Sequence, residues 1–390
     1  MDGLTHSLVG LTSAKAGLER WSPFATAVCI LAANAPDIDA VTFLGGRWSV
    51  LHYHRGITHS IVGTFALGVV IPSLFYFIDW FKSKVRKGKM RIWYPGLLGA
   101  SLLAAATHPL MDWTNNYGLR PLLPWSGRWF YGDLVFIVDP YIWLILGGAA
   151  FLVTSNRGLK IIAWSILAAG VTLLMFVTSA RSASAGANLS IARTIWIAGI
   201  SLFVLARFVK LHQRLGRSIA VGALAFVVIY WGTLAFAHYA AYEKASAVAD
   251  QIVWPTGENV VRVAAMPTLG DARRWLCIAE TDRAIYRFFV KLGTPVSTWP
   301  AADHNRIGSM PAVERFAKPV DGSERLVSLA SRDPRAQILL GFARFPIERV
   351  ENENCLDQTL VQFADLRYTE PGGASLGSFS LNVPVECSAP

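Results

Sequence analysis

The sequence predicts an all-α polytopic membrane bundle of about seven to eight transmembrane helices, followed by a small β-rich extracytoplasmic domain. Hydrophobic residues make up 53% of the 390 residues and charged residues only 16%, against about 25% charged in soluble domains. Of the 26 acidic residues, 8 precede Tyr242 and 18 lie beyond that point. These observations exclude a purely soluble enzyme and predict a transmembrane domain over residues 1–241 and a second domain over residues 242–390.

Seven apolar segments approach or exceed the roughly 20 residues that cross a bilayer. They cover residues 23–44, 57–81, 94–113, 136–154, 159–180, 191–208 and 219–241. Residues 4–18 are shorter and include Lys15, and no small-residue cleavage site follows them, which argues against a signal peptide. We count this segment as a short eighth span, because that arrangement brings His6 to the same depth as the other polar groups.

The Lys and Arg residues of the short loops set the orientation. With the basic loop at residues 82–91 in the cytoplasm, strict alternation of the spans places 14 basic residues inside and 6 outside, as the positive-inside rule requires. The chain then leaves its last span on the outer face. A basic total in a membrane protein is explained by such loops, and no nucleic-acid motif is present.

The C-terminal segment has β-rich runs separated by Pro and Gly, at about residues 260–265, 285–292, 337–345, 359–368 and 378–385. These runs predict a small sandwich or barrel. Three cysteines, Cys277, Cys355 and Cys387, allow one disulfide outside the cytoplasm, with the pairing left open. Cys29 lies in a span, and we interpret it as a buried thiol.

Ionisable side chains inside apolar spans are functional candidates by default, and here they recur in four short blocks. The blocks are Thr5-His6, Pro36-Asp37-Ile38-Asp39, His54-Arg55-Gly56-Ile57-Thr58-His59-Ser60 and His108-Pro109-Leu110-Met111-Asp112. His108 and Asp112 are four residues apart, so a helix places them on one face. The alternative to a metal-binding pair is a polar pair that forms hydrogen bonds between helices and holds them together.

The predicted topology brings the four blocks to the outer ends of their spans. His6, His59 and His108 would then face Asp112 and at least one of Asp37 and Asp39 at one depth. Imidazole and carboxylate donors without thiolate suit zinc, with manganese or iron as alternatives. A metal with an open position activates water, so hydrolysis at the membrane surface is the reaction class that this pattern favours.

Other polar residues adjoin the predicted metal site. Arg55 is four residues from His59 and could clamp an anionic group, while Asp39 or Asp112 could act as general base. Three further residues could accept a hydrogen bond from a ligand imidazole N–H or lie beside the ligands: His54, Asp133 and Asp139.

Taken in order, the four blocks resemble the YdjM-like family of inner-membrane, metal-dependent hydrolases. The resemblance covers approximately residues 1–141 and is looser beyond them, chiefly at Asp365-Leu366-Arg367-Tyr368. It implies a bacterial inner-membrane location, and with the orientation set by the loop charges the C-terminal domain is expected to be periplasmic. It also implies a set of metal residues, with Asp39 and Arg55 adjoining as catalytic residues: His6, Asp37, His59, His108 and Asp112.

The expected function is metal-dependent hydrolysis of a lipid or amphiphilic ester or phosphoester at the outer membrane–water interface. Two alternatives stay open: a metal or proton transporter, and a non-catalytic envelope protein with a structural metal. The sequence identifies neither the scissile bond nor a protein partner of the C-terminal domain.

Overall fold

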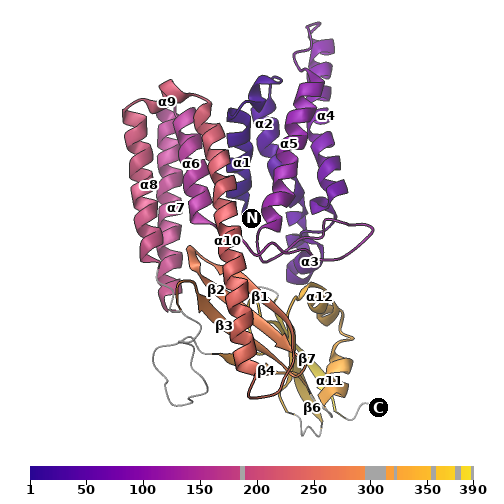
Figure 1. The fold of residues 1–390 in the computed structure, drawn as a ribbon. Coiled ribbons are helices and arrows are strands. Elements are labelled where there is room, and N and C mark those ends of the chain that lie inside the picture. Colours follow the sequence, from indigo (N-terminus) through magenta and orange to yellow (C-terminus); the bar gives the residue numbers. More distant parts are fainter. Residues whose placement is uncertain (185–188, 295–312, 320–322, 353–356, 374–378, 388–390) are drawn as a thin grey trace. The chain divides into compact units, whose positions relative to one another are not determined.

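A computed structural model describes residues 1–184, 189–294, 313–319, 323–352, 357–373 and 379–387 (Figure 1). The chain divides into two compact units. Unit 1 contains Met1–Asp39, Arg55–Phe236 and Pro267–Ala272, and unit 2 contains Ala40–His54, Ala237–Met266 and Arg273–Pro390. The predicted helical N-terminal region and β-sheet C-terminal domain are both present.

The first helices of unit 1 are short and closely packed. They are α1 (Gly3–Lys15), η1 (Leu18–Arg20), α2 (Ala25–Asn34) and η2 (Ala35–Gly45), of which η2 crosses into unit 2, where α3 (Gly46–Tyr53) follows. Asp2 caps α1 by accepting a hydrogen bond from the backbone N–H of Thr5 at 3.0 Å. Gly10 lets α1 approach α2, because a Cβ there would lie 2.6 Å from the carbonyl oxygen of Cys29.

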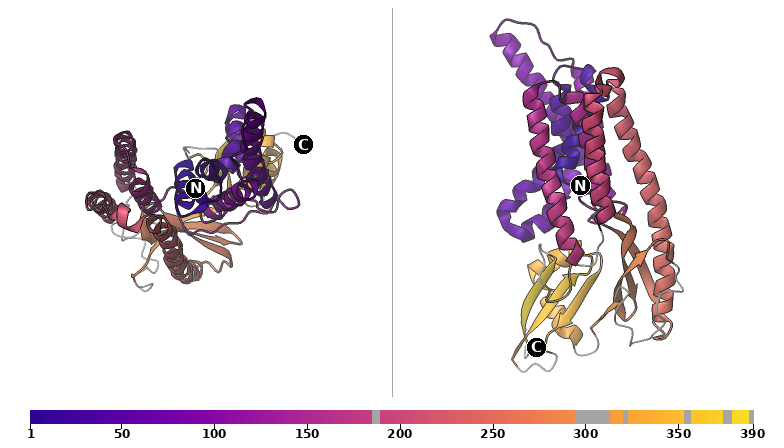
Figure 2. Two further views of the ribbon diagram at one scale, coloured as in Figure 1. Left: turned by 90° about the horizontal axis from the view of Figure 1, so that it is seen from above. Right: turned by 90° about the vertical axis from the view of Figure 1, so that its left-hand side faces the viewer.

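The longer helices of unit 1 follow η3 (Ile57–His59). They are α4 (Ile61–Val85), α5 (Tyr94–Trp113), α6 (Pro140–Thr154), α7 (Gly158–Ser184), α8 (Ser190–Phe208), α9 (Leu211–Leu215) and α10 (Ser218–Val253), of which α10 continues into unit 2. Figure 2 shows α6, α7 and α8 running alongside one another. Ser60 caps α4, and Asp139 with Pro140 begins α6, as expected of these residue types at helix N-termini.

Five helical stretches among the described residues are long and apolar enough to cross a membrane, so the predicted count of seven to eight is not confirmed. They are Ala25–Tyr53, Ile61–Val85, Gly158–Val177, Ser190–Phe208 and Ser218–Val253. Helix α1 has 13 residues and is about 20 Å long at 1.5 Å per residue, short of the 30 Å hydrocarbon layer. Helix α5 has the length, but His108, Pro109 and Asp112 lower its hydropathy.

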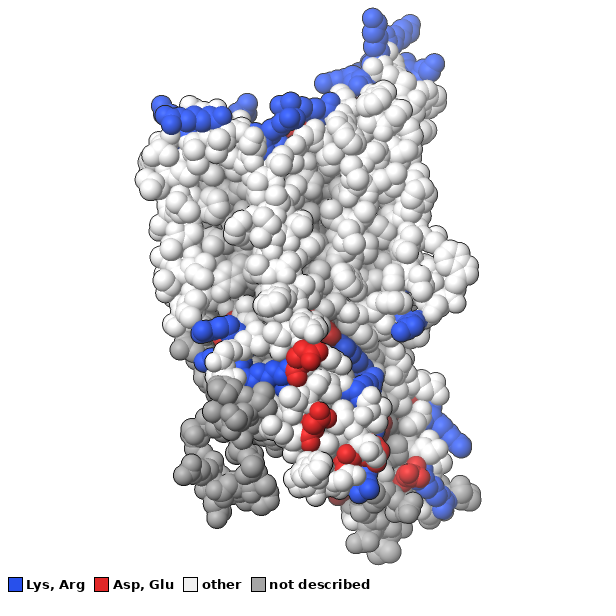
Figure 3. Space-filling view, viewed as in Figure 1, with Lys and Arg blue, Asp and Glu red and all other residues white. Residues whose placement is uncertain are grey.

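On the face that Figure 3 shows, the unit 1 helices are nearly free of charge between their ends. Lys and Arg gather at the ends of these helices near α9, where the picture is blue. Many large apolar side chains are exposed along α4, α7 and α8, for example Phe65, Ile166 and Leu202. An exposed apolar surface of this extent fits contact with lipid rather than water.

Unit 2 contains two antiparallel sheets. One has the order β1-β2-β3-β4 with β1 (Val260–Thr268), β2 (Asp271–Thr281), β3 (Ala284–Lys291) and β4 (Glu314–Ala317), and the ends of β1 and β2 fall in unit 1. The other has the order β5-β6-β7 with β5 (Pro346–Val350), β6 (Gln358–Asp365) and β7 (Ser380–Glu386). Both sheets contribute to one apolar cluster that includes Met266, Ile278, Phe345 and Leu366.

The strand predicted at residues 337–345 is wrong, because residues 337–342 belong to helix α12 (Pro334–Phe342), which follows α11 (Ser323–Ala330). Asp333 caps α12 by accepting from the backbone N–H of Arg335 at 2.7 Å, and Pro334 stands in its first turn. A capping Asp followed by Pro is the local signal for a helix start. Cys387 is disulfide-bonded, Cys29 and Cys277 are free and buried, and Cys355 lies outside the described residues.

Candidate metal site

Unit 1 brings five separated His and Asp residues together. His6 lies on α1, Asp37 on η2, His59 at the end of η3, and His108 with Asp112 on α5. The three histidines are fully buried and Asp112 is 1% exposed, whereas the Asp37 side chain is 29% exposed. One edge of the cluster, at Asp37, is therefore open to the surroundings.

Asp37 and Asp39 contact opposite nitrogens of the same imidazole. Asp37 Oδ1 lies 3.3 Å from His59 Nε2, and Asp39 Oδ2 lies 3.2 Å from His59 Nδ1. The two acids are on the 3₁₀ helix η2, where three residues make a turn, so residues two apart point in different directions. Asp37 faces the donor cluster, while Asp39 lies behind His59.

Three donor atoms form a triangle of nearly equal sides. His59 Nε2 lies 3.1 Å from His108 Nε2, and Asp37 Oδ1 lies 3.3 Å from the former and 3.5 Å from the latter. Ligand atoms about 2.0 Å from a tetrahedral zinc ion are about 3.3 Å apart. The triangle thus has the dimensions of one face of such a coordination sphere.

The far nitrogen of each of these two imidazoles has a partner. His108 Nδ1 lies 2.7 Å from the carbonyl oxygen of Ala33, and a carbonyl only accepts, so this nitrogen carries the proton. His59 Nδ1 lies 3.2 Å from Asp39 Oδ2, which only accepts, and 3.1 Å from Thr58 Oγ1, which donates its own proton to the same carboxylate, so this nitrogen also carries a proton. Both Nε2 atoms then present lone pairs to each other at 3.1 Å, and a cation between them would remove this repulsion.

His6 and Asp112 extend the donor set. The His6 ring stacks on His108 with centroids 3.7 Å apart, and its Nε2 lies 3.3 Å from Asp112 Oδ1. Both nitrogens of His6 are buried and make no hydrogen bond. Asp112 Oδ2 lies 3.4 Å from His59 Nε2 and 3.6 Å from His108 Nε2. Two overlapping groups, His6-His108-Asp112 and Asp37-His59-His108, could hold a metal ion, and the imidazole and carboxylate donors fit a divalent one.

Arg55 binds Asp112 through two nitrogens. Its Nε lies 3.1 Å from Asp112 Oδ2, and its Nη2 donates to Asp112 Oδ1 at 3.2 Å. Nη1 donates to Asn115 Oδ1 at 2.9 Å and to the carbonyl oxygen of Gly118 at 3.1 Å, and the guanidinium lies over the Tyr117 ring. These contacts give Arg55 the role of holding Asp112, and its predicted role as a substrate clamp stays a prediction.

Asp39 is tied to the segment that precedes His59. Its Oδ2 accepts hydrogen bonds from the backbone N–H of Arg55 and from Thr58 Oγ1, both at 3.0 Å. Arg55 adopts a positive φ of 55°, a conformation that costs free energy in a non-glycine residue. The Asp39 hydrogen bond to its N–H helps to stabilise that turn, which sets the positions of both the guanidinium and the His59 ring.

The sequence also predicts that Asp139, Asp133 and His54 support the metal ligands. Asp139 caps α6 through the N–H groups of Tyr141 and Ile142, and it accepts from Tyr230 Oη at 2.9 Å. Asp133 is buried at a positive φ of 53° in the loop before α6. His54 ends α3 and belongs to unit 2. Their role in supporting the metal ligands stays a prediction.

Sequence reasoning missed the partners that orient the donors. The carbonyl of Ala33, the loop residue Asn115 and the Trp143 side chain were not expected. Trp143 Nε1 donates to Thr5 Oγ1 at 2.9 Å and contacts Asp2, so it anchors the helix start that carries His6. The polar residue next to His6 in the Thr5-His6 block was the available signal for the Trp143 contact.

Two comparisons place the N-terminal part of the chain among known proteins. Residues 1–183 match the family described as YdjM inner membrane protein. "Uncharacterized protein YfhP" of Bacillus subtilis (strain 168) is 27% identical over 193 residues, which is 46% of this chain and 55% of that protein. The chain thus matches only about half the length of this relative. No solved structure matches the chain. The resemblance expected from the four blocks is confirmed: through residues 1–183 the chain is related to the YdjM inner membrane protein family.

Proposed function

We propose that the chain is a membrane-bound, metal-dependent hydrolase that acts on a lipid or amphiphilic ester or phosphoester at the outer membrane–water interface. The observation that carries the proposal is the pair of opposed imidazole nitrogens, His59 Nε2 and His108 Nε2, 3.1 Å apart with a carboxylate oxygen beside them. Buried like groups at this distance are explained by a cation that they share.

The metal would be held by His6, Asp37, His59, His108 and Asp112. A divalent ion in such a site lowers the pKa of a bound water and polarises the substrate oxygen. Mixed imidazole and carboxylate donors favour zinc, with manganese or iron as alternatives.

The individual residues of the site have different proposed roles. Asp39 acts through His59, since its Oδ2 lies 3.2 Å from His59 Nδ1, on the far side of the ring from Nε2, so we assign it a positioning role. Asp112 is assigned to the metal, because Oδ1 faces His6 and Oδ2 faces His59 and His108. Arg55 holds that carboxylate in place from the other side. Substrate would enter at Asp37, the exposed member of the cluster.

An extracytoplasmic C-terminal domain is part of the proposal. The basic residues of the short loops favour this orientation. The disulfide at Cys387 supports it, because disulfides persist in oxidising compartments and are rare in the cytoplasm.

The test is elemental analysis of the full chain purified in mild detergent, with the same samples assayed on phosphodiester and lipid ester panels. We expect stoichiometric divalent metal in the wild type and in His212→Ala, whose histidine lies on α9 outside the cluster. His59→Ala and His108→Ala should lose metal and hydrolysis together.

Other results would redirect the proposal. Metal retained without turnover on any substrate would favour a structural metal or a transporter. Absence of metal from wild type purified without chelator would contradict the metal site itself.

A further inference from the structure

Unit 1 contains an apolar cavity of about 140 Å³ beside α1, separate from the His and Asp cluster. Helices α1, α6, α7 and α8 line it, through residues that include Leu8, Trp143, Phe151, Val171 and Ile200. Apart from Ser165, its lining consists of Gly, Ala, aliphatic and aromatic residues. An engineered apolar cavity of about this size stays dry and binds benzene, so the space suits hydrocarbon and not water.

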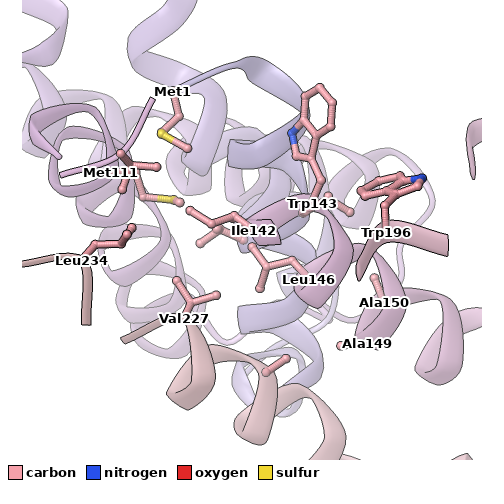
Figure 4. Close-up of a cluster of buried hydrophobic side chains, with 14 residues drawn as sticks. Met1, Met111, Ile142, Trp143, Leu146, Ala149, Ala150, Trp196, Val227 and Leu234 are labelled. Carbon is pink, nitrogen blue, oxygen red and sulfur yellow. The ribbon is translucent and has the colours of Figure 1, made fainter. Parts of the chain in front are cut away.

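The three tryptophans of the cavity have no N–H to offer a ligand. Trp143 Nε1 donates to Thr5, Trp164 Nε1 to Thr154 at 2.8 Å, and Trp196 Nε1 to Thr172 at 2.9 Å. Trp143 and Trp196 border the apolar core around Ile142 and Leu146 (Figure 4). With these donors satisfied, the occupant is expected to be a group without polar atoms.

Gly147 shows that the helices could pack in the same way with a larger side chain filling part of this space. This glycine lines the cavity in the interior of α6, where glycine is less favourable than alanine, and a Cβ there would meet nothing closer than Leu8 Cδ1 at 3.9 Å. Its neighbour Gly148 differs, because a Cβ would lie 2.2 Å from the Phe203 ring. Gly148 is needed for close packing, whereas the missing side chain of Gly147 leaves room.

The cavity opens on the lipid side and ends next to the helix that carries His6. Leu167 of α7 and Val204 of α8 line it and are 38% and 42% exposed, on helices long and apolar enough to span a membrane. At the other side Leu4 and Leu8 of α1 line it, and Trp143 is hydrogen-bonded to Thr5, the residue before His6. A chain entering from the bilayer would therefore reach the N-terminal end of α1.

We propose that this cavity binds one acyl chain of a bilayer lipid and so holds an amphiphilic substrate with its polar group near the His and Asp cluster. The binding of the chain stands on the cavity alone, whereas its role in positioning a substrate rests on the proposed hydrolase function. The required ligand is a single unbranched or methyl-branched hydrocarbon chain without polar groups along its inserted part.

The experiment uses the full chain in nanodiscs that contain a phosphatidylethanolamine with a diazirine on one palmitoyl chain. After irradiation, mass spectrometry maps the cross-linked peptides. We expect cross-links at the cavity-lining parts of α6, α7 and α8, and a decrease of about tenfold in Gly147→Phe, the effect of excluding roughly two methylene groups. Gly170→Phe is the control, because it adds the same side chain to exposed α7 where nothing lies within 4 Å.

A graded series protects the test against a folding defect. Gly147→Ala and Gly147→Leu should lower the cross-linking in order of side-chain size, with the metal content unchanged. Cross-links spread evenly over the lipid-facing surface, or equal in Gly147→Phe and Gly170→Phe, would overturn the proposal. Cross-links in the cavity of a chain that hydrolyses no substrate would support the acyl-chain site and contradict the proposed hydrolase function. Hydrolysis without cross-links in the cavity would contradict only the acyl-chain site.

Discussion

Acidic side chains are arranged differently in the two units. In unit 2 each of the acids Glu258, Glu280 and Asp365 pairs with a basic side chain, for example Asp365 Oδ2 with Arg367 Nη2 at 2.7 Å. In unit 1 Asp37, Asp39 and Asp112 converge on shared imidazoles, with Arg55 and the Met1 amino group in contact with Asp112. Paired charges hold a fold together, whereas acids and imidazoles that share one centre are arranged for an added cation.

The largest effect should come from breaking one buried Arg–Asp pair in each unit. Asp112→Asn and Asp365→Asn each leave a buried guanidinium without its charge partner, at a cost of about 3–5 kcal/mol. We expect a similar loss of thermostability in both variants, but loss of metal only in Asp112→Asn. Thermal unfolding and elemental analysis of the same samples measure this. Equal metal loss in both variants would mean that metal binding depends on the general stability of the chain. It would contradict the proposed difference between the acids of unit 1 and those of unit 2.

The next effect concerns the acid behind the cluster. Asp39→Asn keeps the shape of the side chain but removes the charge that holds the His59 Nδ1 proton, and loss of such a partner typically lowers metal affinity 10–100-fold. Competition with a chelator of known affinity measures the change. Glu280→Gln, which removes a paired acid in unit 2, serves as the control, and an equal decrease there would contradict a role for Asp39 in orienting His59.

A packing change should separate the close helix contact of unit 1 from an open glycine in unit 2. Gly10→Ala places a methyl group 2.6 Å from the carbonyl oxygen of Cys29, which should cost about 1–3 kcal/mol of stability. Gly341→Ala on α12 meets nothing within 4 Å and should stabilise by about 0.4–1 kcal/mol. Opposite shifts in the melting temperature would bear this out, and a neutral Gly10→Ala would show that α1 and α2 can separate.

The smallest effect is a pH dependence confined to unit 2. Burial opposes ionisation of Glu258, but hydrogen bonds from Thr281 and Arg315 outweigh it and lower its pKa below the ordinary 4.5. Its contribution is therefore complete above pH 4.5 and is lost as the pH falls through the lower folded-state value. We expect Glu258→Gln to flatten the acid limb of thermostability by about 1 kcal/mol or less, since Arg315 is half exposed. An unchanged acid limb would show that Glu258 does not contribute.

Much of the candidate site could be predicted, because the spacing of a few residues along the chain determines which side chains lie together. Four residues separate His108 from Asp112, and a helix places such residues on one face whatever surrounds them. Buried ionisable groups in apolar segments are rare enough to be noticed singly. The roles of Asp37 and Asp39 could not be separated, since only the 3₁₀ geometry of η2 directs one to each side of His59.

The sequence by itself determined the helical N-terminal region, the β-sheet C-terminal domain and the His and Asp blocks, because hydropathy and short-range spacing are local properties. The tertiary structure decided the rest. Arg55 holds Asp112 because a positive φ and the loop from Asn115 to Gly118 place its guanidinium there. The cavity beside Gly147 likewise depends on packing between segments far apart in the chain, which no local pattern records.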